Sequence, residues 1–253
     1  MEINISGPQV YGVIPLNIPI LGDFEISETL VVTWIVMAVI TLLCIILTRN
    51  LKVENISKRQ ALAEFIVEKL DNFVLNIMGE RFRYMIPFIG ALFSLSLVSN
   101  LISLTGLRSP TADLSTEAAW AIVVFIMITR QKIKTNKISG YLKSFTEPIF
   151  VMTPFNILSE LSTPVSMACR HFGNIFSGIV INGLIYGALA VVSSMLLGLI
   201  PGAVGAVLSQ IPILDVGLPA ITSVYFDWFT GCMQAFIFSM LTIMYISTEA
   251  GDG

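Results

Sequence analysis

The sequence predicts an all-α integral membrane protein with about five membrane-crossing helices and one amphipathic surface helix, the last two crossing helices being long and tilted. Three observations support this fold class. Hydrophobic residues make up 55% of the 253 residues and charged residues only 12%, about half the charged share of soluble domains. Uncharged runs long enough to span a bilayer recur along the chain. The basic residues gather in short clusters between these runs.

The charge balance and the cysteines exclude several classes of function. Fourteen Lys and Arg stand against seventeen Asp and Glu, so the chain has no basic surplus with which to bind nucleic acid. The three cysteines, Cys44, Cys169 and Cys232, lie in apolar stretches without metal-ligand spacing. We therefore expect no disulfide framework, no metal site and no cofactor.

We expect one membrane domain over residues 1–253, which begins with an external segment at 1–28 and a first span at 29–48. A helical hairpin at 84–131 follows. Its first arm is uncharged, whereas the apolar part of its second arm covers only 118–129. That stretch is too short to span alone, so we expect it to recruit the polar turns beside it and to pack against the first arm.

Residues 53–80 predict a helix that does not span. Apolar residues recur there at helical spacing, interleaved with charged ones; the apolar set is Leu62, Phe65, Ile66, Leu70, Phe73 and Ile77. An amphipathic helix on the cytoplasmic membrane surface fits this pattern. A helix packed on another protein fits it equally well.

Residues 148–249 predict two long helices, at 148–198 and 219–249. A helix of about fifty residues is about 75 Å long, more than twice the thickness of a bilayer core of about 30 Å. The first of the two must therefore be broken or strongly tilted. Pro164 lies inside it and permits a bend.

Lysine and arginine predict the orientation of the chain in the membrane. Residues 1–28 contain none, residues 49–60 contain four and residues 130–147 contain five. This distribution places the N-terminus outside, gives five crossings and places the C-terminus in the cytoplasm.

The first long helix carries one narrow polar stripe. Its polar residues are spaced by three or four positions and fall within an arc of about 80°; they are Asn156, Ser159, Thr163, Ser166, Arg170, Asn174 and Ser177. The opposite face is apolar. Arg170 lies in the middle of the stripe.

An arginine inside a membrane costs about 3 kcal/mol on insertion scales, and it does not lose its proton to escape that cost. Arg170 therefore needs a carboxylate partner or a water-filled cavity. Glu160 and Asp227 are the candidate partners within the chain. A snorkelling arginine is disfavoured, because uncharged sequence continues for dozens of residues beyond it.

The last helix adds Asp227 and Gln234, which lie seven residues apart and share one face. A membrane carboxylate is costly unless it is used or paired, whereas Gln234 could equally serve as contact between helices. His171, the only histidine, could relay protons. It points about 100° away from the stripe, which favours a packing role.

Three segments resemble subunit a of the bacterial F-type (rotary) ATP synthase. They are EPIFVMTPFNILSELS followed by PVSMACRHFGNIFSG, the C-terminal DWFTGCMQAFIFSMLTIMYIS, and SNLISLTGLRSPTADLSTE. The resemblance covers most of the chain from about residue 60 onward. The segment around Arg170 and the QAFIF segment are together highly specific.

The resemblance implies an ion-conducting stator subunit of the bacterial plasma membrane. Arg170 matches the family's arginine, which faces a ring of c subunits and separates two half-channels that carry H⁺ or Na⁺. The outer half-channel would be lined by Asn174, Gln234, Asn100 and Asp227. The inner one would be lined by Asn156, Ser159 and Glu160, and Ser166 lies on the same stripe.

Two positions depart from the family pattern. Ile179 stands where the family has Glu or His, which leaves Asp227 as the main titrating group of the outer half-channel. His171 stands where a leucine is expected. The helix at 62–78 looks like the one that meets the b subunits of the peripheral stalk. The chain has no phosphate-binding loop, so nucleotide chemistry is expected in other subunits.

Two other readings stay open. In a secondary transporter, Arg170 would clamp an anionic substrate, and the chain would be active alone. In a purely structural subunit, replacing Arg170 would change nothing. The stripe argues against the second, because a scaffold needs no arginine in mid-span.

Overall fold

The computed structural model describes residues 8–18, 22–54, 56–147, 149–198, 222 and 224–249. In chain order its main elements are β1 (Val10–Ile18), β2 (Gly22–Ser27), α1 (Glu28–Thr48), α2 (Lys58–Met78), α3 (Ile86–Leu101), α4 (Leu114–Ser144), α5 (Thr153–Gly198) and α8 (Thr230–Thr248). Short 3-10 turns flank α3 and precede α4 and α5, and one π-helical turn at Val224–Phe229 leads into α8. The start of the helix predicted at 219–249 lies outside the described residues.

The N-terminal segment forms a β-hairpin, which the sequence analysis did not predict. Strands β1 and β2 pair antiparallel, with Val10 opposite Ser27 and Val13 opposite Glu25. The strand VYGVIPLNI is rich in β-branched residues, which favour extended backbone. The hairpin leads directly into α1, and all the other described elements of regular structure are helical.

Four described helical segments are long and apolar enough to cross a membrane: Glu28–Thr48, Glu80–Thr105, Phe150–Leu196 and Val224–Thr248. The first agrees with the predicted span at 29–48. It begins where the Ser27 hydroxyl accepts a hydrogen bond from the Leu30 N–H, as an N-cap residue does. Helix α4 is not among the four, because its second half is basic.

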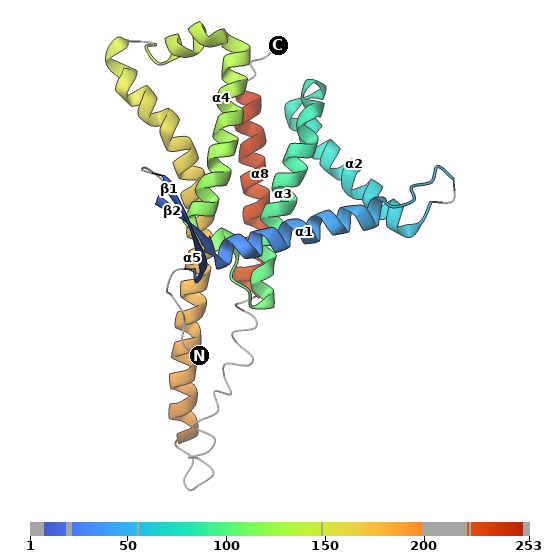
Figure 1. The fold of residues 1–253 in the computed structure, drawn as a ribbon, viewed down its shortest axis with the longest axis vertical. Coiled ribbons are helices and arrows are strands. Elements are labelled where there is room, and N and C mark those ends of the chain that lie inside the picture. The colour runs from blue at the N-terminus through green and yellow to red at the C-terminus, as the bar shows by residue number, and fades with distance from the viewer. Residues whose placement is uncertain are drawn as a thin grey trace.

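The prediction that the second arm of the hairpin packs against the first was wrong. Helix α4 packs mainly against α5 rather than against α3, and α4 and α5 run antiparallel (Figure 1). The basic end of α4 matches carboxylates on α5 and α8, as described below, whereas α3 offers none.

Helix α5 is long and continuous. It has 46 residues, which corresponds to about 69 Å, and it runs through Pro164 without ending. Figure 1 shows α1 running across the molecule, whereas α3, α4, α5 and α8 run along it. Because α5 is continuous and longer than a bilayer core of about 30 Å, tilt rather than a break accommodates its length in a membrane.

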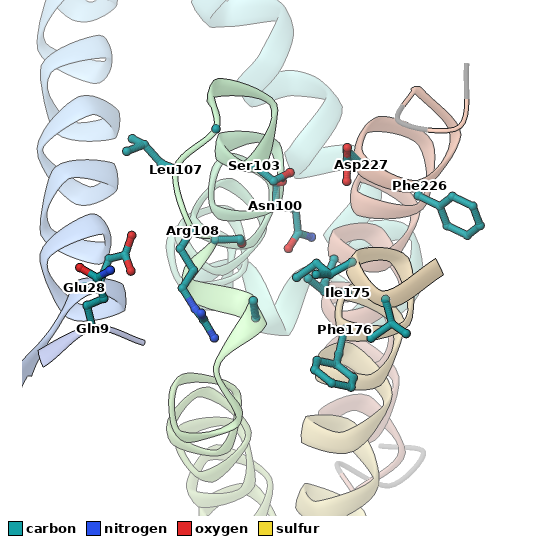
Figure 2. Close-up of a pocket in the computed structure, with 15 residues that line it drawn as sticks. Gln9, Glu28, Asn100, Ser103, Leu107, Arg108, Ile175, Phe176, Phe226 and Asp227 are labelled. Carbon is teal, nitrogen blue, oxygen red and sulfur yellow. The ribbon is translucent and has the colours of Figure 1, made fainter. Parts of the chain in front are cut away.

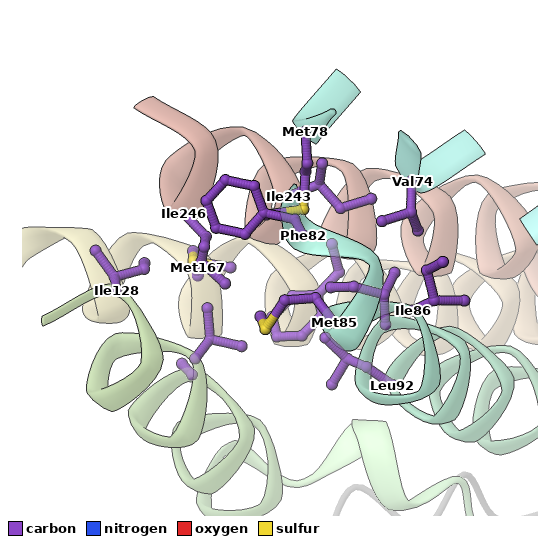
Figure 3. Packing of buried hydrophobic residues seen from close by; sticks show 14 of the residues in the cluster. Val74, Met78, Phe82, Met85, Ile86, Leu92, Ile128, Met167, Ile243 and Ile246 are labelled. Carbon is purple, nitrogen blue, oxygen red and sulfur yellow. The ribbon is translucent and has the colours of Figure 1, made fainter. Parts of the chain in front are cut away.

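The hydrophobic core forms where α2, α3, α4, α5 and α8 meet (Figure 3). Its buried residues include Val74, Phe82, Met85, Ile86, Ile89, Val124, Ile128, Met167, Ala168, Phe238 and Ile243. Helix α5 enters this core through Met167 and Ala168, directly before Arg170. Most of the rest of α5 is exposed: only 11% of its most apolar window is buried.

Helix α2 is amphipathic, as the sequence predicts. Val74 and Met78 at its C-terminal end are buried in the core, whereas Leu62, Phe65 and Ile66 are 52%, 55% and 50% exposed. These apolar side chains face away from the chain. A membrane surface or another subunit could cover them.

Candidate functional site

Arg170 lies on the open face of α5. Its side chain is exposed, as is that of Ser166 one turn before it, and Asn174 one turn after it is half-buried. Within the described residues, Arg170 makes no hydrogen bond or ion pair. The pair with Glu160 or Asp227 that the sequence left open is therefore not formed there. A charge of this kind on an apolar helix needs water or a partner from outside the chain.

Glu160 belongs to a separate ionic cluster. Its Oε2 lies 2.6 Å from Nζ of Lys132 on α4, and the same ammonium lies 3.4 Å from Oε1 of Glu249 after α8. Burial opposes the charge on Lys132, but the two carboxylates outweigh it, so the pKa of Lys132 is raised above its ordinary value. The cluster joins the middle of α4 to the first part of α5 and to the residue after α8, and it gives Glu160 a cation of its own.

Asn156 and Ser159, the other two residues expected in the inner half-channel, differ in their exposure and hydrogen bonding. Asn156 donates hydrogen bonds from Nδ2 to the carbonyl oxygens of Phe145 and Glu147, at 2.8 and 3.0 Å. It thus secures the turn between α4 and α5. Ser159 is exposed on the face that also carries Ser166 and Arg170.

A cavity of about 360 Å³ lies between the start of α1, the α3–α4 connection, the middle of α5 and the turn before α8. Figure 2 shows Glu28 on one side of it and Asp227 on the other, with Asn100 and Ser103 between them. Arg108 completes the charged lining. Two negative and one positive side chain around one cavity make it a place where an ion and water can be held.

This cavity contains only part of the expected outer half-channel. Asn100 and Asp227 line it, whereas Asn174 and Gln234 do not; Gln234 is only 4% exposed. Gln9, Glu28 and Arg108 were missed by the sequence reasoning. Arg108 carried a signal, since it is the sole basic residue in the connection 105–117. Gln9 and Glu28 carried none, because the hairpin that brings them there was not predicted.

His171 points about 100° away from Arg170 around α5 and is fully buried. Its Nδ1 lies 3.0 Å from Oε2 of Glu117 on α4, and its Nε2 lies 3.3 Å from Nδ2 of Asn100 on α3. The rings of Trp120 and Phe238 pack beside it, with centroids 6.2 and 5.4 Å away. His171 thus packs between aromatic rings, as expected, and also makes polar contacts with Glu117 and Asn100. Glu117 was not singled out from the sequence.

A membrane-embedded helical protein with an exposed arginine on a polar stripe, and with a charged cavity beyond it, has the features of an ion-conducting membrane subunit. The family profile of the ATP synthase A chain matches residues 30–247, and the chain belongs to this family, that of ATP synthase subunit a. It is therefore a multi-pass, ion-conducting stator subunit of a bacterial ATP synthase, and it does not itself perform the nucleotide chemistry.

Individual relatives agree over nearly the full length. The chain is 32% identical to ATP synthase subunit a 1 of Crocosphaera subtropica, over 88% of this chain and 87% of the relative. It is 34% identical to ATP synthase subunit a 2 of Acaryochloris marina, over 90% and 88%. It is also 29% identical to the sodium-ion-specific ATP synthase subunit a of Propionigenium modestum, over 98% and 86%. Family membership rules out the secondary-transporter and scaffold readings.

Proposed function

We propose that Arg170 is the fixed charge that separates two half-channels and faces a rotating ring of c subunits. The observation that carries this proposal is the exposed Arg170 guanidinium, which has no partner among the described residues and lies on a polar stripe in an otherwise apolar helix. No described helix of the chain covers this face, which leaves it open to another subunit.

The physical role of such a cation follows from electrostatics. A fixed positive charge stabilises an ionised carboxylate and disfavours its protonated or metal-bound form. A ring carboxylate that approaches Arg170 must therefore release its ion on one side, pass as an anion and reload on the other. Each charge that crosses a potential of 100 mV carries about 2.3 kcal/mol, so several crossings per turn can drive ATP synthesis elsewhere in the complex.

The two half-channels are assigned to the stretches of α5 before and after Arg170. The cavity lined by Asn100 and Asp227 supports the outer one, to which Asn174 and Gln234 would add polar surface towards Arg170. Asn156, Ser159, Glu160 and Ser166 would line the inner one. The orientation of the basic clusters supports the same assignment: the N-terminus outside the plasma membrane and the C-terminus in the cytoplasm.

The exposed apolar side of α2 supports a second contact. Leu62, Phe65 and Ile66 are each about half exposed, and we assign this side to the b subunits of the peripheral stalk and the adjoining lipid. Such a contact would hold the chain still while the ring turns.

The test is ATP-driven ion uptake into inverted membrane vesicles that carry the whole ATP synthase. Arg170→Ala should assemble, as judged by blotting, but should neither pump nor couple. Cys169→Ser, at the exposed neighbouring position, is the matched control and should pump normally. If assembled Arg170→Ala pumps at the rate of the unaltered complex, the separator role is wrong. Repeating the assay with and without Na⁺ identifies the ion.

A further inference from the structure

A buried polar cluster lies behind Arg170, and of its members only Asn100 has a part in the function proposed above. It consists of His171, Glu117, Asn100, Thr111 and the carbonyl group of Gly231, and we call it the His171 cluster. Consecutive residues of a helix point about 100° apart. Arg170 accordingly faces outward, whereas His171 and Glu117 are 0% exposed.

The His171 cluster joins four helices at one point. His171 on α5 lies 3.0 Å from Glu117 on α4 and 3.3 Å from Asn100 on α3. Nδ2 of Asn100 also donates a hydrogen bond to the carbonyl oxygen of Gly231 on α8, at 2.8 Å. A Cβ atom at Gly231 would lie 3.1 Å from Cβ of Asn100, so the lack of a side chain allows this close approach.

The partners of Asn100 determine where the proton of His171 lies. The Gly231 carbonyl can only accept a hydrogen bond and the Thr111 hydroxyl donates to Oδ1 at 2.7 Å, which fixes the orientation of the amide. Nδ2 therefore presents its second N–H to Nε2 of His171, which must accept. The proton of the neutral ring is then on Nδ1, the atom that lies 3.0 Å from Oε2 of Glu117.

His171 and Glu117 depend on each other. The carboxyl oxygens of Glu117 make no hydrogen bond among the described residues, and the one ionic contact given for Glu117 is with His171. The rings of Trp120 and Phe238 enclose the imidazole, so it cannot turn towards water. Removing His171 leaves the Glu117 carboxyl group buried without a partner, and removing Glu117 leaves Nδ1 of His171 without one; either loss is costly.

We propose that His171 is a positioning residue for Arg170, and that its pair with Glu117 sets the rotation and height of α5 where the arginine meets the ring. This inference rests on the function proposed for Arg170. No described residue holds the guanidinium, so its place depends on the backbone of α5 alone. Apolar contacts such as those of Met167 tolerate small shifts, whereas a buried polar pair specifies one register. Displacements of about 1 Å are enough to impair chemistry that depends on geometry.

The geometry favours this role over proton transfer. Both side chains of the pair are fully buried, and no described hydrogen bond continues from Glu117 to another polar group. A relay through the pair needs an exit beyond Glu117, and the described contacts of Glu117 provide none.

The experiment compares His171→Leu, Glu117→Leu and the double variant in the whole ATP synthase in inverted vesicles. Ion uptake per ATP hydrolysed is measured together with the amount of assembled complex. Poor folding lowers both activities in proportion, whereas a misplaced arginine lowers uptake per ATP. We expect each single variant to lose about ten-fold in this ratio. The double variant removes the buried carboxyl group together with the imidazole and leaves only one N–H of Asn100 without its acceptor, so it should recover to within about three-fold of the unaltered complex.

Met167→Leu is the matched control, because it conserves volume in the same core one turn earlier and should leave the ratio unchanged. The inference is wrong if the single variants keep their uptake per ATP, or if the double variant is no better than the worse single one. If neither single variant assembles, recovery of assembly in the double variant supports the pair, and continued failure overturns it. Arg170→Ala separates the two proposals: if it abolishes pumping while both single variants couple normally, only this inference fails.

Discussion

A fixed charge on a helix can act on a passing ring only if its own chain does not neutralise it. In this protein, the carboxylates near Arg170 form their ionic contacts with other residues and leave Arg170 unneutralised. Glu160, only ten residues before Arg170, is held by Lys132, and Glu117 is held by His171. Each carboxylate that α4 or α5 brings near Arg170 thus has a cation or an imidazole of its own. The arginine remains available to a carboxylate from another subunit.

Asp227 is the residue that we expect to exchange ions in the outer cavity. Asp227→Asn keeps the shape of the side chain but removes its ability to bind and release a proton or a metal ion. ATP-driven uptake should fall by at least about ten-fold, whereas Asp227→Glu should retain most of it. The measurement is initial uptake rate in vesicles matched for assembled complex. Glu54→Gln, which removes an exposed carboxylate elsewhere, serves as control. Full activity of Asp227→Asn would remove Asp227 from the pathway.

At the scale of the helices, the cluster of Lys132, Glu160 and Glu249 determines how α4, α5 and α8 meet at one end. The side chains of Lys132 and Glu160 are only 18% and 16% exposed. A pair so shielded from water holds its geometry better than a surface pair. It also stops a basic helix end from resting against apolar surface, which explains why α4 prefers α5 to α3.

Lys132→Met should therefore destabilise the complex, because it leaves Glu160 buried without its cation. Adding Glu160→Gln should recover part of the loss, with an interaction energy of about 1–3 kcal/mol. The measurement is the temperature at which the purified complex loses this subunit. Lys143→Met provides the control, because it breaks the pair of Lys143 and Glu147, whose two side chains are 74% and 61% exposed. It should change the dissociation temperature little. Additive effects of Lys132→Met and Glu160→Gln would show that the pair contributes no stability.

At the scale of the whole molecule, the apolar runs were sufficient to predict most of the helices, whereas the stripe left open whether Arg170 pairs with Glu160 or Asp227 or faces a water-filled cavity. The span expected at 29–48 is found at Glu28–Thr48, because the apolar run and the Ser27 cap are both local signals. The pair of Glu117 and His171 was not predicted, since it depends on how α4 packs on α5. Glu28 and Arg108 were missed as cavity residues for the same reason: neither lies on a periodic pattern, and only the folded chain brings them together.

The orientation of the whole chain is the last prediction, and accessibility to a membrane-impermeant thiol reagent tests it. Val13→Cys in the β-hairpin precedes α1, and Val53→Cys follows it before α2. Both native side chains are well exposed, at 53% and 96%. Each is introduced after Cys44, Cys169 and Cys232 have been replaced by serine. We expect Val13→Cys to react in right-side-out vesicles and Val53→Cys in inverted ones, because α1 crosses once and the basic cluster after it stays in the cytoplasm. Permeabilised vesicles, in which both should react, provide the control. Labelling with the sides reversed would place the cavity of Asp227 on the cytoplasmic face and would exchange the two half-channels.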